Sequence, residues 1–309
     1  MLSRIAESLF WIGRYIERAE DTSRILDVQF HRMLEDPWID EDLAWVTLLQ
    51  VMGAEPDPPG RVNADAVCEI LAYDTTSASS IVGALTAARD NARGVREVVP
   101  SEMWECLNAT WYALGPEVTR ANTLGPHNLF QFVKERAAML EGLINSSLSR
   151  DDGWRFLVLG ASLERVDMTT RLLSTCCSGS TGTATWVTTL RSCSAHEAYL
   201  RTYQRAVDAS RAAEFMLLDR LFPRSIFHAL STAESCLAEL DPVTSRSGQS
   251  NDARRALGQA RTHLEFARSD EVLQNLPGLL ARVQSYCSDA ASAVASRYFR
   301  QTSAIRWTA

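Results

Sequence analysis

Two stretches of the chain carry the same charged residues at the same spacing. Residues 10–26 read FWIGRYIERAEDTSRIL, and residues 157–173 read LVLGASLERVDMTTRLL. In each stretch a Glu-Arg dipeptide follows a glycine by four positions; the dipeptides are Glu17-Arg18 and Glu164-Arg165. An arginine can bind a carboxylate through two parallel hydrogen bonds, and a glutamate can bind an ammonium group or act as a general base. The dipeptides therefore predict ion pairing, binding of a charged ligand, or proton transfer.

The repeated charges lie on one helix face in both stretches. At about 100° per residue, the apolar side chains gather on one side of each helix and the charged side chains on the other. A single charged face is usually solvated and contributes little. Because solvated faces change freely, retention of the charges in two diverged stretches favours a network buried between helices, or one that binds a ligand or a partner. The candidate residues are Glu17, Arg18, Glu20, Asp21, Arg24, Glu164, Arg165, Asp167 and Arg171.

A second repeated pattern, Asp-x5-Ser-Ile, precedes two further helices. A serine at such a position caps the helix by accepting a main-chain N–H, and capping is the simplest interpretation. The remaining N–H groups of a helix start also favour an anion, and one copy adds an arginine directly before the serine. The candidate anion-binding helix starts comprise Asp74, Ser80, Asp219, Arg224 and Ser225.

Known catalytic, metal and cofactor motifs are absent from the sequence. The five histidines form no H-E-x-x-H or E-x-x-H pattern, which argues against a zinc protease or a di-iron bundle. No Gly-rich phosphate loop and no G-x-S-x-G turn occurs. The sequence thus identifies no catalytic residue, and it predicts no metal ion and no cofactor.

Charge and composition exclude several classes of protein. The net charge is -7, which argues against a nucleic-acid partner because phosphate binding needs a positive surface. No run of apolar residues is long enough for a transmembrane helix, and the first residues do not resemble a secretory signal. Seven scattered cysteines are typical of reduced thiols. We therefore expect a cytoplasmic protein that does not bind a membrane.

The pattern of apolar residues predicts an all-α protein. We expect a first helix from about Ser3 to about Leu34, a helix over 79–99, and a final helix from about Leu276 to Tyr298. Three collinear matches between the halves indicate an internal duplication, with repeats of about 1–148 and 149–309. The predicted fold is a single domain, 1–309: an internally duplicated, pseudo-twofold helical bundle of about ten helices.

Four stretches of the chain together resemble the bacterial alpha-E domain family. They cover 8–26, 79–99, 154–173 and 217–226, and the Glu-Arg motif of the family falls on the two dipeptides described above. The resemblance spans nearly the whole chain and implies an all-helical domain of unknown function. One departure is Ala161-Ser162, which stands where a basic residue is expected, so the charge balance of the second motif differs from that of the first.

The resemblance also implies a biological setting. Family members are typically encoded beside, or fused to, a circularly permuted ATP-grasp protein, often with a transglutaminase-like protease nearby. This implies an accessory or substrate-presenting partner of an amide- or peptide-ligase system, with the Glu-Arg motifs binding a peptide, an amino acid or the partner, rather than an enzyme. Two alternatives stay open. The protein itself could be an enzyme with Glu17 or Glu164 as general base, or the Glu-Arg pairs could be purely structural locks between helices.

Overall fold

The protein is almost entirely helical. The structure, a computed structural model, describes residues 1–54, 62–177, 182–243, 246, 248–268, 272 and 274–299. Within these ranges it contains thirteen α-helices and one π-helical turn, η1 (Glu69–Tyr73), and no strand. The predicted all-α class is confirmed. About ten helices were expected, fewer than the thirteen that these ranges contain.

The α-helices have the following bounds. They are α1 (Ser3–Glu35), α2 (Glu41–Met52), α3 (Ala64–Cys68), α4 (Ile81–Gly94), α5 (Ser101–Leu124), α6 (His127–Ser147), α7 (Asp152–Thr175), α8 (Thr183–Ser192), α9 (His196–Tyr203), α10 (Ala209–Leu218), α11 (Ile226–Leu240), α12 (Asp252–Glu265) and α14 (Leu276–Tyr298).

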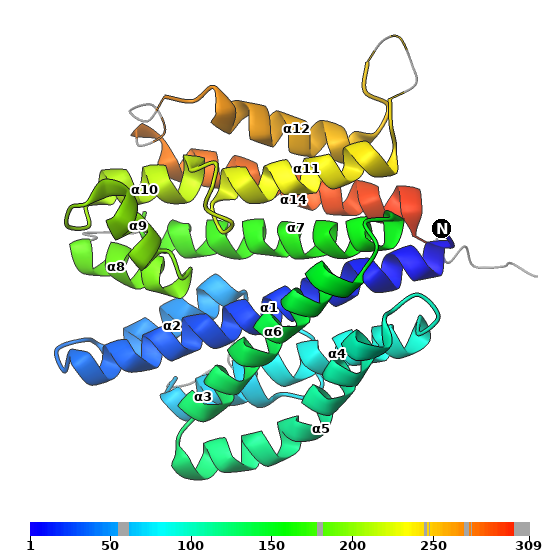
Figure 1. Ribbon diagram of the computed structural model, residues 1–309. Coiled ribbons are helices and arrows are strands. Elements are labelled where there is room, and N and C mark those ends of the chain that lie inside the picture. Colours follow the sequence, from blue (N-terminus) through cyan, green and yellow to red (C-terminus); the bar gives the residue numbers. More distant parts are fainter. Residues whose placement is uncertain are drawn as a thin grey trace, which may run out of the picture.

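Helices α1 and α7 carry the two Glu-Arg dipeptides and lie together in the middle of the molecule (Figure 1). The apolar face of α1 is buried, as its periodicity predicts. The helix ends at Glu35, two residues before Pro37, which cannot continue it. Helix α7 begins after Asp151, whose carboxylate accepts the main-chain N–H groups of Gly153 and Trp154.

The remaining long helices surround this central pair in two similar sets. Helices α4 and α6 pack against α1, and α5 packs against both. On the other side, α11 and α14 pack against α7, and α12 packs against both (Figure 1). The same packing scheme therefore occurs around each Glu-Arg helix. An internal duplication, with its repeat boundary near residue 148, stays a prediction.

One helix end differs from the expected one, and another helix continues past a proline. Helix α4 ends at Gly94 and not near Val99, whereas α5 continues to Leu124, past Pro116. A proline inside a helix leaves the carbonyl four residues earlier without its hydrogen bond. Here that residue is Tyr112, which is exposed, so water can satisfy the carbonyl.

Among the described residues, no helix is long and apolar enough to cross a membrane.

Candidate functional site

Glycines bring the main chains of α1 and α7 into contact. A Cβ atom on Gly13 would lie 2.0 Å from the main-chain oxygen of Leu157, and a Cβ on Gly160 would lie 2.0 Å from that of Phe10. Real Cβ atoms do not approach an oxygen so closely, so both positions need glycine. Because each Glu-Arg dipeptide starts one helical turn after its glycine, the crossing places the two dipeptides opposite each other.

The two dipeptides bind one another reciprocally. Arg165 donates from Nε and Nη2 to the two carboxylate oxygens of Glu17, at 2.6 and 2.7 Å. Arg18 donates in the same way to Glu164, at 2.5 and 3.2 Å. The glutamates are only 4% and 2% exposed. The motif of each helix thus neutralises that of the other in a buried position.

Each buried glutamate also receives a second arginine, but from different places in the chain. Arg14 on α1 donates to Glu164 at 2.6 Å. The corresponding position on α7 is Ala161, so Glu17 cannot receive an arginine from there. Arg224, just before α11, donates to Glu17 instead, at 3.0 Å. Arg224 therefore supplies to Glu17 the second guanidinium that position 161 does not provide.

Arg224 is the centre of a wider network on α1. Besides Glu17, its guanidinium binds Glu20 at 2.8 Å and also binds Asp21. Arg24 binds Glu20 in turn. The structure thus brings together most of the charged residues predicted on α1, together with Arg165 of α7.

Asp167 and Arg171 lie apart from this network. Arg171 binds Asp167 at 2.9 Å on the same helix and reaches toward the main-chain oxygen of Val51 at 3.4 Å. Both residues lie on α7, and Arg171 also contacts α2. A role for any of these charged residues in binding a ligand or partner stays a prediction.

The surrounding charges make the two buried glutamates weak bases. Burial alone would raise the pKa of Glu17, but the guanidinium groups of Arg165 and Arg224 outweigh it and lower this pKa to about 2. Burial and the two arginines Arg14 and Arg18 act on Glu164 in the same way, and its pKa is also lowered. A carboxylate with so low a pKa accepts a proton poorly near neutral pH. These lowered pKa values give no support to Glu17 or Glu164 as general base.

Asp21 shows the opposite shift. Burial raises its pKa to about 7, with the nearby carboxylates of Glu17 and Glu20 adding to the rise and Arg224 opposing it. Its Oδ2 atom is buried and has no hydrogen-bond partner among the described residues. Asp21 is therefore the member of the network whose ionised form is disfavoured by its surroundings.

The predicted anion-binding helix starts have the structure of helix caps. Ser80 Oγ accepts the main-chain N–H of Gly83 and donates to the main-chain oxygen of Asp74. Ser225 makes the equivalent bonds to His228 and Asp219. The carboxylate of Asp219 accepts the N–H groups of Leu221 and Phe222, and that of Asp74 accepts the N–H of Thr76, so both aspartates close the preceding turn. Capping is confirmed, whereas anion binding stays a prediction.

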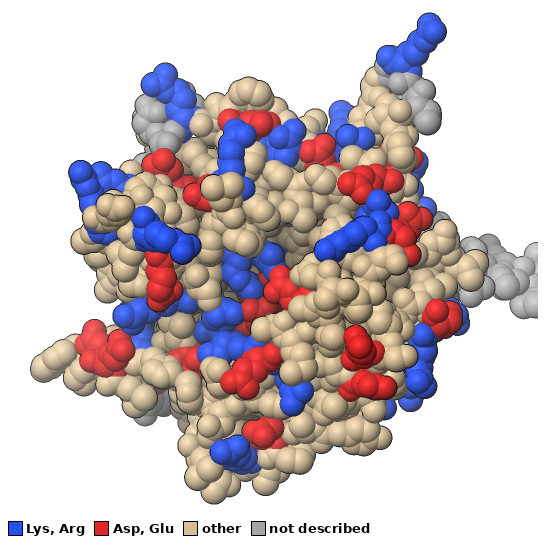
Figure 2. Space-filling model, in the orientation of Figure 1, with Lys and Arg blue, Asp and Glu red and all other residues tan. Residues whose placement is uncertain are grey.

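A cavity of about 290 Å³ lies beside the crossing of α1 and α7. Helices α6 and α11 complete its walls, and apolar residues including Ile16, Ile144 and Leu157 line much of it. Ala161 also lines it, at the position where α1 carries Arg14. Figure 2 shows acidic and basic side chains interspersed in a hollow near the centre of the face that it presents.

The charged groups of this cavity are mostly acidic. Its lining includes the carboxylates of Glu17, Glu20 and Glu141 but only one guanidinium group, that of Arg165. Glu141 is exposed and has no ion-pair partner among the described residues. The sequence did not predict Glu141 as a site residue, because it lies on α6 and belongs to neither repeated motif. The cavity that it lines was therefore not predicted either.

A larger depression of about 950 Å³ lies between α12 and α14. None of the predicted site residues lines it, and two of the four arginines in its lining, Arg254 and Arg261, are paired with Glu234. The smaller cavity is therefore the better candidate site, because it combines enclosure with the charged residues of the crossing.

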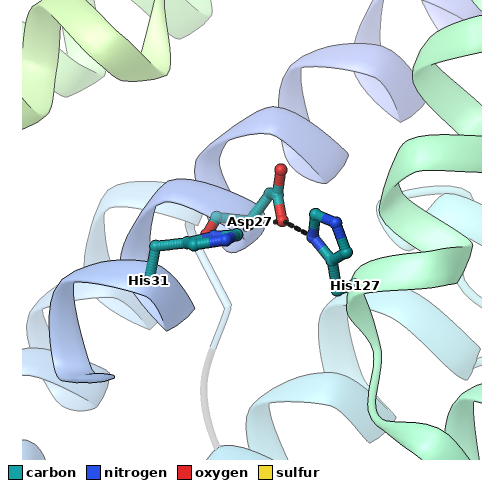
Figure 3. Close-up of side chains that lie close together, drawn as sticks. All are labelled: Asp27, His31 and His127. Atoms are coloured by element: carbon teal, nitrogen blue, oxygen red, sulfur yellow. Dashed lines mark hydrogen bonds and ion pairs between the residues drawn. The ribbon is translucent and has the colours of Figure 1, made fainter. Parts of the chain in front are cut away.

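Asp27, His31 and His127 form a separate cluster that the sequence did not reveal (Figure 3). His127 Nδ1 lies 2.6 Å from Asp27 Oδ1, and Lys134 Nζ lies 2.6 Å from Asp27 Oδ2. One nitrogen from each histidine and one carboxylate oxygen lie within 4.8 Å of one another, an arrangement that could hold a metal ion. Asp27 and His31 are one turn apart on α1, but His127 is 100 residues away, so no local motif marks the cluster.

Comparison with known proteins places the sequence motif in a family. Residues 1–299 match the Alpha-E family model, described as a predicted alpha-helical domain with a conserved ER motif. Uncharacterized proteins of Mycobacterium tuberculosis and Mycobacterium bovis are each 25% identical to the chain, over 93% of its length and 36% of theirs. The chain thus spans about a third of the length of these relatives. No solved structure matches it significantly.

Proposed function

The chain belongs to the Alpha-E family, and from this premise we propose that it is a non-catalytic, substrate-presenting subunit of an ATP-grasp-type amide or peptide ligase system. The observation that carries the proposal is the cavity of about 290 Å³ beside the two Glu-Arg helices. A cavity of this size accommodates one amino-acid side chain or a chain terminus. The ligase partner itself is proposed from the family resemblance.

The lining of the cavity favours a positively charged group on an apolar stem. Glu17 and Arg165 neutralise each other, and Glu20 is bound by arginines, which leaves Glu141 as the acidic group able to pair with a ligand. Apolar walls provided by Ile144 and Leu157 suit the methylene groups of a lysine side chain. We therefore assign the cavity to a peptide that presents a lysine or another ammonium group.

In this proposal the Glu-Arg pairs are structural. Every one of their carboxylate oxygens accepts at least one guanidinium N–H, so the pairs have little capacity left for a ligand. Their role is to fix the crossing of α1 and α7 and thereby the shape of the adjacent cavity. The longer relatives, in which the matching region is joined to further sequence, suit a unit that works beside other parts of a larger system.

The ligand is tested by thermal shift with two end-blocked tripeptides, Ala-Lys-Ala and Ala-Glu-Ala. We expect only Ala-Lys-Ala to raise the Tm of the protein. Ala161→Leu, which fills the cavity, and Glu141→Gln should both abolish this shift. Ala138→Leu is a matched control, because Ala138 lies on α6 but is exposed. Equal shifts with both peptides, or a shift that survives Ala161→Leu, would contradict the assignment.

The partner is tested separately by pull-down from the native lysate, with mass spectrometry of the recovered proteins. We expect tagged parent protein to recover an ATP-grasp protein, and Ala161→Leu to recover it equally, since the cavity binds substrate and not the ligase. Failure of the parent to recover any ATP-grasp protein would contradict the partnership, even if the peptide experiment succeeded.

A further inference from the structure

We propose that Asp27, His31 and His127 bind a divalent transition-metal ion, with zinc as the ion that best suits this set of ligands. Two imidazoles and one carboxylate are a common set of protein ligands for zinc. The site is independent of the peptide cavity, which none of the three residues lines.

The fold brings the three ligands together from two helices. Asp27 and His31 share one face of α1 because they are separated by four residues, and His127 is the first residue of α6. Their ligand atoms lie within 4.8 Å of one another. In a tetrahedral zinc site with bonds of about 2.0 Å, ligand atoms are about 3.3 Å apart. The atoms must therefore move closer by up to about 1.5 Å, a change that rotation of the two exposed histidine side chains can provide.

The groups around the ligands hold them in place. The Nδ1 atom of His31 lies 2.8 Å from the main-chain oxygen of Asp27, a contact that fixes the ring. Metal-binding histidines commonly use one ring nitrogen for such a bond and the other for the metal. Lys134 Nζ donates a hydrogen bond to Oδ2 of Asp27, so the carboxylate binds the metal through Oδ1 alone.

Metal binding replaces one hydrogen bond of the metal-free protein. In the metal-free protein, Asp27 Oδ1 accepts a hydrogen bond from His127 Nδ1 at 2.6 Å. Coordination of zinc by Nδ1 requires the ring to carry its proton on Nε2, so a neutral His127 changes tautomer without net proton release. No other bond breaks.

The site is open on one side. The side chains of His31 and His127 are 53% and 58% exposed, so the fourth coordination position faces solvent. Water or a side chain of a partner can complete the tetrahedron there. The bound ion joins the second half of α1 to the start of α6.

The test is a zinc titration of chelator-treated protein in competition with a chromophoric chelator. We expect one equivalent of zinc to bind, and His127→Ala and His31→Ala each to weaken binding at least about tenfold. His263→Ala is the control for adventitious binding, because His263 is exposed and distant from the cluster in sequence. It should leave the affinity unchanged, and circular dichroism of each variant verifies the fold.

The substitution Lys134→Met should change the zinc affinity in the opposite direction. It removes a positive charge from Asp27 and should strengthen zinc binding several-fold, because the carboxylate then donates more fully to the metal. Absence of stoichiometric binding, or binding that survives His127→Ala, would overturn the proposal and leave the cluster as a hydrogen-bond network. An unchanged affinity in Lys134→Met would contradict the use of Asp27 as a ligand.

Discussion

Glu17 shows what a single buried charge requires of its neighbours. It lies between Arg165, for which it is the main counter-charge, and Arg224, which it shares with Glu20 and Asp21. A buried ion pair adds little net stability, but removal of one partner leaves the other charge buried and unpaired. The network is therefore sensitive to substitution in a way that exposed ion pairs are not.

Substitution of Glu17 should destabilise the fold strongly. We expect Glu17→Gln to lower the free energy of unfolding by about 3–5 kcal/mol, because the buried guanidinium of Arg165 loses its main counter-charge and that of Arg224 loses one of its three carboxylate partners. Urea unfolding followed by circular dichroism measures this. The matched control is Glu97→Gln, which breaks an exposed pair with Arg4 at 3.5 Å and should cost no more than about 1 kcal/mol. Equal effects of the two substitutions would show that burial of the network does not matter.

Asp21 predicts a dependence of stability on pH. Its pKa is about 7 in the folded protein and 3.8 in the unfolded reference, so the folded state binds its proton more tightly. Its contribution to stability is full below about pH 3.8 and is lost as the pH rises through 7. Asp21→Asn removes this loss of stability. The Tm of the variant minus the Tm of the parent should therefore increase as the pH rises from 5 to 8. Thermal melts across this range measure it, and a constant Tm difference would contradict the raised pKa.

Glu17 acts in the opposite direction at lower pH. Its pKa of about 2 lies below the reference value of 4.5, so its stabilising contribution is present above pH 4.5 and is lost as the pH falls toward 2. The two residues thus affect different pH windows. This separation allows the Asp21 effect to be measured between pH 5 and pH 8 without interference from Glu17.

At the scale of the elements, the crossing of α1 and α7 depends on two glycines. The crossing is what allows the Glu-Arg dipeptides to meet, so its geometry determines the whole network. In Gly13→Ala the new methyl group meets a main-chain oxygen, which cannot move without displacing its helix. Gly160→Ala creates the same conflict on the other helix.

We expect each of these substitutions to cost about 3 kcal/mol, the upper end of the range usual for overpacking. Chemical denaturation measures the loss. Gly142→Ala on α6 is the control, because its Cβ would meet nothing within 4 Å, and it should stabilise the protein by about 0.5–1 kcal/mol. A loss in Gly142→Ala as large as that in Gly13→Ala would mean that helix packing is not responsible.

At the scale of the whole molecule, the crossing joins the two sets of helices into one unit. Helix α4 packs on α1 and α11 packs on α7, while α1 and α7 share the buried charge network. Neither set can lose its central helix without exposing the buried charges of the other. We therefore predict that the chain unfolds as a single cooperative domain.

Native-state hydrogen exchange tests this cooperativity. The slowest amides of α4 and α11 should exchange with the same free energy of opening, and Glu17→Gln should lower both values equally. Exchange in α11 that is unaffected by Glu17→Gln would instead indicate two independently unfolding halves, because α11 belongs to the second half of the chain.

The sequence by itself determined the features that depend on local pattern. Its apolar periodicity predicted the all-α class and the bounds of the first and last long helices, because such periodicity recurs within a few residues. The repeated Asp-x5-Ser-Ile pattern predicted the caps at Ser80 and Ser225 for the same reason. The repeated Glu-Arg dipeptides predicted a charge network that is buried between helices or binds a ligand or a partner, and the two helices that carry them share a buried network.

Only the tertiary structure decided which of these residues meet. Arg224 and Glu17 are 207 residues apart, and no pattern in the sequence pairs them. The cavity is enclosed by four helices, with Ala161 at the position where the other helix has Arg14, and the approach of His127 to Asp27 depends on how α6 packs against α1. Helix periodicity fixes the face on which a side chain lies, but the crossing of packed helices fixes what that face contacts.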